Sequence, residues 1–385
     1  MHEGYTPEVQ TMLDVLEELV EKIGPRPAGG PAEAQAMQCL KNWFSGWGYQ
    51  ISEFSFSFAG YPKFNAYYAL PAFVFMVAAW FQALIPWLAL LLPVLIAALP
   101  ELWQAWNRRR RKTRSAKNLF ALPNGLSMDQ LDLILCAHVD TARHNPVLAS
   151  PWRKLLEQVF ATMLRVAWLL IMLSIFYILG FEVPRPVAYA VGIVYSLFGL
   201  YLIVMDMLEQ FGHHNLYVAG AHDNASGVAV LAAVARALAQ NESSARKVGF
   251  LFTSAEETGM WGAQAFAEHM AANGLSIPVM VLDQVGAGQT LRVVTGVGRF
   301  RPMRSDDIIL QALRRADPAA EDLFYIYRNG DFSEFLRVGI PAVSLETSGS
   351  LRAKEAYHTT RDTLRVIDPK TLEHVYRTVM KYLQI

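Results

Sequence analysis

The sequence predicts an α/β fold in which a mixed, mostly parallel sheet is flanked by helices and carries two inserted transmembrane helical hairpins. Short strand-like runs at residues 131–137, 247–253, 278–282 and 341–345 alternate with helical stretches. This alternation is typical of a largely parallel sheet with both faces covered. Two strongly apolar regions, residues 64–100 and about 155–207, interrupt the pattern and are too long for single strands or ordinary core helices.

The composition agrees with such a division. Of the 385 residues, 53% are hydrophobic and 18% are charged, whereas soluble domains average about 45–50% and about 25%. Lys plus Arg and Asp plus Glu balance at 34 each, so no overall field favours nucleic acid, and we expect no nucleic-acid partner. Two cysteines are too few for a disulfide framework, and the first ten residues lack the apolar core of a cleavable signal peptide.

The chain begins with two amphipathic helices. Apolar residues recur at helical spacing from about Pro7, the segment 24–27 breaks the pattern with Gly and two Pro, and a second helix follows over 31–47. Residues 49–58 then alternate apolar and polar side chains, which predicts a half-buried strand.

The two apolar regions predict helical hairpins over residues 64–106 and 153–211. The first has no charge between residues 64 and 100 and turns near Ile85 and Pro86, while a polar loop at 180–186 divides the second. About 20 apolar residues cross a bilayer, so each region suits two spans. Buried core helices are the alternative interpretation.

A basic run, residues 107–114 with Lys117, follows the first hairpin. Such a run can be a solvated face or bind nucleic acid, but basic flanks next to a span mark the cytoplasmic side. We therefore expect an integral membrane protein with the lipid bilayer as partner, four spans, and the α/β domain and both termini in the cytoplasm. His213 and His214 are expected at the membrane interface.

Side chains able to bind a metal follow several of the predicted strands. The run 131–137 delivers His138, with Asp140 two residues later, and the strand ending at Thr253 is followed by Glu256 and Glu257. A metal-bound imidazole needs a partner that fixes its tautomer, which suits His-x-Asp. Adjacent acids point in different directions, so one can bind metal while the other faces a water molecule.

Three further positions complete this set. Asp283 directly follows a strand, His358 lies in a polar loop, and Asp223 lies in the stretch 220–227 that runs into a helical repeat. Asp, Asn and Ser are common helix caps, so the stretch 220–227 alone can be only a cap. Ligands of open α/β sheets bind beyond the carboxyl ends of the strands, and a shared edge would bring these side chains together. The remaining histidines have no such setting.

These segments resemble metallopeptidase family 28, the co-catalytic zinc aminopeptidases. The matching segments occur in the family's order, at residues 24–27, 137–140, 222–227, 254–259, 282–283, 339–343, and 357–359 with Asp362. The resemblance implies a zinc-exopeptidase-like fold and two Zn²⁺ ions, other divalent metals being possible. It implies that Asp223 bridges the two ions, that His138 and Asp283 complete one site, and that Glu257 and His358 complete the other.

The resemblance also implies the activity, a membrane-bound aminopeptidase that removes N-terminal residues from peptide substrates. Glu256 would be the general base for a metal-activated water, Asp140 the partner that orients His138, and Tyr357 a group that stabilises the oxyanion. The sequence departs from the family pattern at His222, where Asp is frequent, at Gln284, where Met is frequent, and in its two hairpins.

The predicted domain organisation follows from these assignments: peptidase domain over 1–63, 107–152 and 212–385, with the hairpins at 64–106 and 153–211 between them. Each insertion must cross the bilayer an even number of times, because the chain on both sides of it joins one domain. Two alternatives stay open. One is a glutaminyl-cyclase-like, single-zinc aminoacyltransferase, and the other is a non-catalytic membrane scaffold on a peptidase fold.

Overall fold

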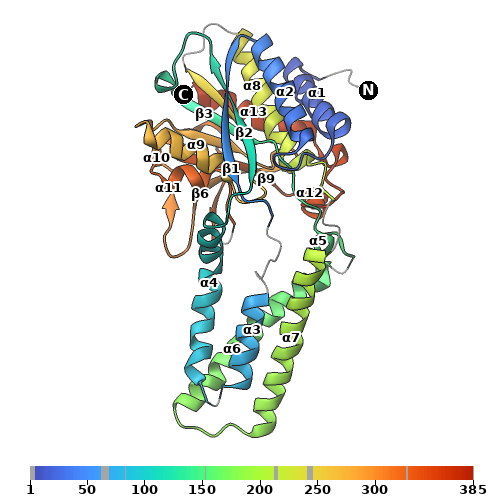
Figure 1. Cartoon of the computed structure of the whole chain (residues 1–385), viewed down its shortest axis with the longest axis vertical. Coiled ribbons are helices and arrows are strands. Elements are labelled where there is room, and N and C mark those ends of the chain that lie inside the picture. Colours follow the sequence, from blue (N-terminus) through green and yellow to red (C-terminus); the bar gives the residue numbers. More distant parts are fainter. Residues whose placement is uncertain are drawn as a thin grey trace. The chain divides into compact units, whose positions relative to one another are not determined.

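A computed structural model describes residues 5–61, 69–82, 84–151, 153–211, 216–240, 246–326 and 328–384. The chain forms two compact units. The sheet unit comprises Met1–Tyr61, Arg109–His144 and Asn215–Ile385, and the helical unit comprises Pro62–Arg108 and Asn145–His214. Both units appear in Figure 1.

The sheet unit contains a nine-stranded mixed sheet with the order β1-β2-β4-β3-β5-β9-β6-β7, in which β8 pairs with β6. The four central strands, β4, β3, β5 and β9, are parallel, while β1 and β2 form an antiparallel pair at one edge. The strands are β1 (Tyr49–Phe58), β2 (Arg114–Pro123), β3 (Leu133–His138), β4 (Val248–Thr253), β5 (Val279–Leu282), β6 (Thr290–Val297), β7 (Met303–Arg304), β8 (Glu321–Tyr325) and β9 (Ala342–Ser348).

Helices cover both faces of this sheet, because the central strands bury side chains on both sides. In β3, Leu133 and Leu135 belong to one core, and Ile134 and Cys136 belong to the other. The first core receives α1 (Pro7–Glu17), η1 (Glu18–Ile23), α2 (Pro31–Gly46), α8 (Ser226–Gln240), α10 (Asp307–Ala316) and α13 (Pro369–Gln384). The second receives α9 (Trp261–Ala272) and α11 (Phe332–Arg337).

Short helices complete the unit: η2 (Met128–Gln130), η3 (Ala221–Ala225), α12 (Leu351–Ala356) and η4 (Leu364–Val366). The predicted mixed α/β fold is confirmed, and the strand expected at residues 49–58 is β1. Strands β2, β6, β7 and β8 were not predicted from the sequence. Arg114 and Lys117, interpreted as part of a basic membrane flank, lie in β2, where Lys117 pairs with Glu53 on β1.

The helical unit consists of α3 (Ala69–Trp80), α4 (Pro86–Arg108), α5 (Pro146–Ala149), α6 (Arg153–Ile178) and α7 (Arg185–Phe211). Helices α3 and α7 lie close together: a Cβ at Gly199 would come within 2.3 Å of the Met76 sulfur, and Trp80 Nε1 donates to Ser196 Oγ at 2.8 Å. Small residues permit such close helix contacts in membrane proteins.

The described residues do not support the predicted count of four spans. Among the described residues, the stretch Arg185–Val204 of α7 is long and apolar enough to cross a membrane, and Trp168–Ile178 of α6 is a shorter apolar helix. The start of the first predicted hairpin, residues 64–68, and the interface positions His213 and His214 lie outside the described residues.

Candidate metal centre

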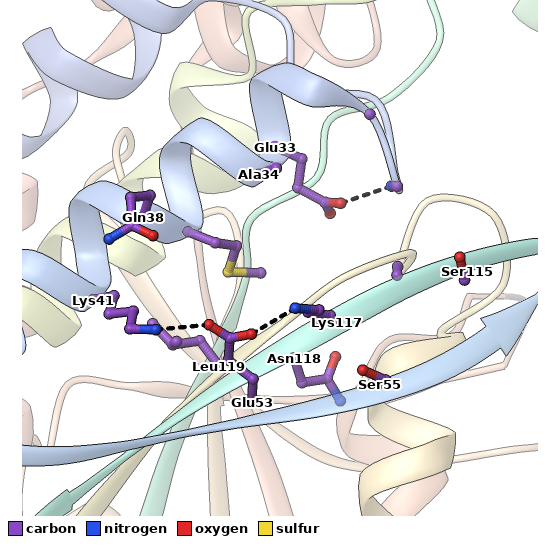
Figure 2. Close-up of a pocket in the computed structure, with 14 residues that line it drawn as sticks. Glu33, Ala34, Gln38, Lys41, Glu53, Ser55, Ser115, Lys117, Asn118 and Leu119 are labelled. Carbon is purple, nitrogen blue, oxygen red and sulfur yellow. Dashed lines mark hydrogen bonds and ion pairs between the residues drawn. The ribbon is translucent and has the colours of Figure 1, made fainter.

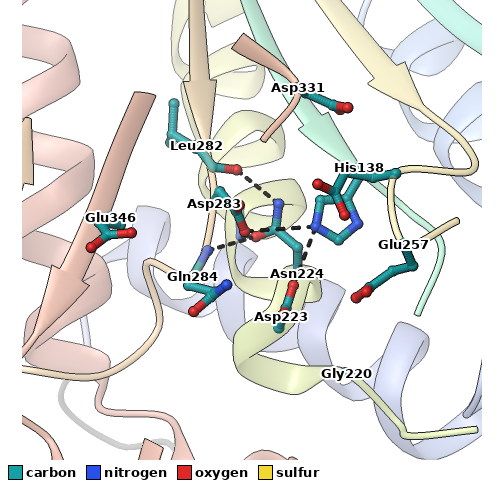
Figure 3. A network of polar contacts seen from close by, with 12 residues as sticks. His138, Gly220, Asp223, Asn224, Glu257, Leu282, Asp283, Gln284, Asp331 and Glu346 are labelled. Atoms are coloured by element: carbon teal, nitrogen blue, oxygen red, sulfur yellow. Dashed lines mark hydrogen bonds and ion pairs between the residues drawn. The ribbon is translucent and has the colours of Figure 1, made fainter. Parts of the chain in front are cut away.

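Three parallel strands deliver the predicted site residues to one edge of the sheet. Strand β3 ends at His138, β5 is followed by Asp283, and β4 is followed by the loop that carries Glu256 and Glu257. Because β3 pairs in parallel with both β4 and β5, these ends share one edge. Figure 3 shows His138, Asp223, Asp283 and Glu257 converging on one space.

The turn before α8 holds Asp223. Gly220 has a φ of 64°, and a Cβ there would lie 2.5 Å from both the Asp223 carbonyl oxygen and Thr141 Cγ2. No larger residue fits this position without a shift of the backbone.

Asn224 makes the capping contacts in this turn. Its Oδ1 accepts hydrogen bonds from Gly227 N at 3.1 Å and Gln284 N at 3.2 Å, and its Nδ2 donates to Leu282 O at 2.8 Å. The turn is therefore a cap for α8, as its sequence suggested, but the capping oxygen belongs to Asn224. The Asp223 carboxylate is left free to face the histidines.

Each oxygen of Asp223 faces a different histidine. Oδ1 lies 3.2 Å from His138 Nε2, and Oδ2 lies 3.4 Å from His358 Nε2. His138 Nε2 is also 3.6 Å from Asp283 Oδ1, and His358 Nε2 is 3.3 Å from Glu257 Oε2. Burial acts to raise the pKa of Asp223, but the two histidines outweigh it and hold that pKa well below its usual range. An ionised carboxylate thus lies between two groups of ligands.

The donor atoms fit metal ions. The groups His138, Asp223, Asp283 and Asp223, Glu257, His358 each bring three ligand atoms within 4.8 Å of one another. His138 Nε2, Asp283 Oδ1 and Glu257 Oε1 are buried without a hydrogen-bond partner, which costs free energy unless a cation lies between them. Imidazole nitrogen and carboxylate oxygen are common zinc ligands.

Asp140 supports both sides of this centre. Its main-chain oxygen lies 3.1 Å from His138 Nδ1, closer than its carboxylate at 3.7 Å. The carboxylate instead accepts hydrogen bonds from Glu256 N at 3.1 Å and Glu257 N at 3.2 Å. Asp140 therefore orients His138 mainly through its backbone, and positions the two glutamates through its side chain.

Glu256 lies within ligand distance of His138 and Glu257 but outside the two Asp223 groups. Burial, and then the nearby acids Asp331, Asp283 and Asp140, raise the pKa of Glu256 well above its usual range, against the opposing effect of His138. A carboxylate with a raised pKa is better suited to accept a proton near neutral pH.

Tyr357 stacks on the His358 ring, with 3.9 Å between the ring centroids and 21° between the planes. Burial and the Asp223 carboxylate raise the pKa of Tyr357 well above its ordinary value. Its hydroxyl therefore stays protonated and able to donate at neutral pH.

Asp362 has a positioning role that the sequence alone did not reveal. Its carboxylate accepts hydrogen bonds from His222 N at 2.8 Å and Asp223 N at 3.1 Å. Burial, together with the Asp223 charge, raises the pKa of Asp362 to about 7. The resemblance included Asp362, but a contact across 139 residues is not visible in a local pattern.

Arg26 is the second positioning residue that sequence reasoning missed. It is fully buried, and its guanidinium donates to five main-chain oxygens, at distances of 2.7–3.2 Å, of Leu19, Gly24, Val139, Ala219 and Gly220. Burial lowers the pKa of Arg26 to about 10, so the group remains charged at neutral pH. It ties the chain after His138 to the turn before Asp223.

The other described histidines lie outside the ligand groups. His222 Nδ1 accepts from Gly286 N at 3.2 Å, His144 Nδ1 accepts from Thr360 N at 3.3 Å, and His374 pairs with Asp317 at 2.7 Å, while the His269 ring lies against Phe54. Gln284, the other position that departs from the family pattern, has a φ of 56°, and its backbone N–H donates a hydrogen bond to Asn224 Oδ1. His222 and Gln284 thus take part in holding the turn to β5.

Comparisons with known proteins agree with this geometry. The sequence model of peptidase family M28 matches residues 205–383. A vacuolar membrane protease of Candida dubliniensis is 28% identical over 165 residues, covering 40% of this chain and 16% of that protein. The chain thus matches about a sixth of the length of this curated relative.

Two solved structures share the fold. Porphyromonas gingivalis glutaminyl cyclase aligns with a TM-score of 0.59 at 16% identity and covers 98% of this chain and 97% of its own. A Zn-dependent exopeptidase from Parabacteroides distasonis aligns with a TM-score of 0.59 at 14% identity, covering 97% of each chain.

Proposed function

Because the sequence model of peptidase family M28 matches residues 205–383, we propose that the chain is a zinc-dependent aminopeptidase that removes N-terminal residues from peptides. The observation that carries the proposal is the position of Asp223. Its two carboxylate oxygens face His138 and His358 separately, and each histidine belongs to its own group of three ligands. This arrangement suits two metal ions that share one bridging carboxylate.

In the proposed centre, His138 and Asp283 would hold one zinc ion with Asp223, and His358 and Glu257 would hold the other. Bound zinc would lower the pKa of a water molecule towards neutrality and polarise the scissile carbonyl. The buried donors with no partner, among them Asp283 Oδ1 and Glu257 Oε1, support this set.

Glu256 is proposed as the general base. Its carboxylate accepts the proton of the attacking water and delivers it to the nitrogen of the leaving amine. Asp140 holds the Glu256 amide and so fixes the direction of the side chain. Tyr357, protonated and stacked on His358, is proposed to donate a hydrogen bond to the oxyanion.

The test combines metal analysis with aminoacyl substrates. The purified wild-type protein should contain two zinc ions per chain and release the N-terminal residue of a peptide. Glu256→Gln should keep both ions while its kcat falls by about 10²–10⁴-fold, the usual contribution of a general base. Near-normal turnover by this variant would exclude the mechanism.

A glutaminyl cyclase activity is the second candidate, because the fold is shared with proteins of that activity. A single-zinc cyclase needs one group of ligands, whereas two groups meet at Asp223 here. Metal stoichiometry, and ammonia release from an N-terminal glutaminyl peptide, would distinguish the two activities.

We further propose that the helical unit is the membrane anchor, with two hairpins that return the chain to the cytoplasm. Large apolar side chains on α6 and α7 are exposed, among them Trp168 and Leu197 at 65% and 64%. Exposed apolar surface of this extent favours contact with lipid, and the relative is named a vacuolar membrane protease. Extraction with alkaline carbonate should leave the protein in the membrane pellet, and reporters fused to either terminus should report a cytoplasmic location.

A further inference from the structure

A cavity separate from the metal centre lies in the sheet unit between α2 and the β1–β2 pair (Figure 2). Its volume is about 370 Å³, and none of the residues that line it is a proposed metal ligand. This size is within the range of small-molecule sites, which is about 300–1,000 Å³. The cavity is lined by charged and polar groups as well as by apolar ones such as Met37 and Leu119.

One end of the cavity has an acid with unused hydrogen-bonding capacity. Glu33, on the first turn of α2, is 4% exposed, and its Oε2 accepts a hydrogen bond from Gly29 N at 2.7 Å. Its other oxygen, Oε1, is buried with no partner at full hydrogen-bonding geometry, and the Ser254 side chain lies near the same carboxyl group. A buried acceptor without a donor is costly, so a ligand that supplies a donor here would gain free energy.

The other end carries two cations that share one anion. Lys41 Nζ lies 3.0 Å from Glu53 Oε1, and Lys117 Nζ lies 2.7 Å from Glu53 Oε2. Two ammonium groups on one carboxylate leave an excess positive charge. The side chains of Lys41 and Lys117 are 41% and 61% exposed, so both can turn towards an anionic ligand group.

The separation of these ends sets the size of the ligand. Glu33 and Lys41 are eight residues apart on α2, which corresponds to about 12 Å along the helix axis. The ammonium and carboxylate of a single amino acid are too close together to reach both. An extended chain advances about 3.3–3.6 Å per residue, so three or four residues cover the distance.

We propose that this cavity is a second binding site for a short peptide with free termini. The peptide ammonium donates to Glu33, and the peptide carboxylate binds Lys41 and Lys117. The apolar wall at Met37 and Leu119 contacts the side chains between the two ends.

The site is connected to the loop that carries Glu256. Asn118 lines the cavity, its Oδ1 accepts from Ser254 N at 3.1 Å, and its Nδ2 donates to Gly262 O at 2.8 Å. It therefore holds both ends of the loop 254–262. A peptide packed against Asn118 restricts this loop and so alters kcat. This effect on kcat rests on the proposed peptidase function. The binding of the peptide in the cavity does not depend on that function.

Binding is tested by calorimetric titration of the full-length Glu256→Gln protein with trialanine. Two sites are expected, one at the metal centre and one in the cavity. Adding Glu33→Gln should weaken the cavity site by about 10-fold or more, because the peptide ammonium then loses the carboxyl group that its positive charge would hold in the ionised form. Lys41→Met should weaken the same site, and Glu18→Gln, outside the cavity, should change neither.

Titration with trialanine amide distinguishes the cavity site from the metal centre. An aminopeptidase centre needs the free N-terminus, whereas the cavity also needs the carboxylate, so the amide should lose only the cavity site. The proposal would be overturned by a single trialanine site, or by a second site whose affinity is unchanged by Glu33→Gln and by Lys41→Met.

Thermal midpoints of the variants show whether each is folded, so that a loss of binding is not confused with a loss of folding. In the Glu33→Gln variant the new side-chain amide oxygen can still accept a hydrogen bond from Gly29 N, and Lys41 lies on an exposed part of α2. Both variants should therefore fold, and at neutral pH the thermal midpoint of Glu33→Gln should be no lower than that of the wild type. Failure of the wild type to hydrolyse peptides would overturn the proposed function and leave the binding result intact.

Discussion

The two halves of the candidate metal centre are built differently. His138 ends a central strand, is 1% exposed, and has its second ring nitrogen 3.1 Å from the Asp140 backbone. His358 lies in the segment after α12, is 25% exposed, and has its ring stacked on Tyr357. The strand half, His138 and Asp283, is fixed by the sheet. The loop half, His358 and Glu257, depends on loops and on the residues that support them. We therefore expect the strand half to hold its metal more tightly.

The largest effect should come from the residue that both halves share. Asp223→Asn removes the charge and one of the two coordinating oxygens, so both metal sites weaken. Loss of several kcal/mol of metal-dependent stabilisation corresponds to about 10³-fold or more in kcat/KM. Metal content and kcat/KM measured on the same preparation check this expectation. A variant that keeps two tightly bound ions would show that Asp223 does not join the halves.

The next prediction compares the halves directly. His358→Ala should lose one zinc ion and retain the other, whereas His138→Ala should lose the tighter ion and weaken the second through the freed Asp223. Stepwise removal of metal from the wild type with a chelator should show two affinities. His374→Ala, at an exposed ion pair with Asp317, serves as a matched control. Equal affinities in the wild type, or equal losses in the two variants, would contradict the difference inferred between strand and loop.

Much of the strand half could be predicted from the sequence, because each ligand directly follows an apolar run. His138 and Asp283 were predicted in this way, the mixed α/β fold is confirmed, and the match of the M28 sequence model to residues 205–383 agrees with the family resemblance. The family match agrees with the proposed class, a metallopeptidase hydrolase. Strand β2 was missed because its basic residues resembled a membrane flank, and its role depends on pairing with β1.

The supports of the site could not be predicted, since their partners lie far away in the chain. Asp362 binds amides about 140 residues before it, and Arg26 binds main-chain oxygens close to it and more than 100 residues after it. Neither residue belongs to a periodic pattern, so only a three-dimensional arrangement reveals what it holds. Similarly, Asn224 and Asp223 are equivalent as cap candidates in the sequence, and their different roles depend on contacts with β5.

Replacing Arg26 tests whether the hydrogen bonds of its guanidinium keep the strand half of the centre rigid. Arg26→Met leaves five main-chain oxygens without this donor, and each unsatisfied buried group costs about 1–3 kcal/mol, so we expect the free energy of unfolding to fall by about 3 kcal/mol or more. Zinc affinity should fall with it, first at the His138 site. Arg236→Met, which removes one hydrogen bond to Thr11 from an exposed arginine, should have a much smaller effect. If both variants were equally stable, Arg26 would not be the clamp.

The last prediction concerns Glu33, a buried acid that interacts with Asp140, the residue that positions Glu256 and Glu257. Burial, and then the Asp140 charge, raise the pKa of Glu33 from 4.5 to about 8. Because the folded-state pKa is the higher one, the folded protein binds the proton more tightly, and this stabilisation is fully present below pH 4.5 and is lost as pH rises through about 8. Glu33→Gln removes this dependence, so the wild type should lose stability relative to the variant between pH 4.5 and 8. Thermal midpoints of both proteins across this window measure the difference, and parallel curves would mean that Glu33 is not held in its protonated form in the folded protein.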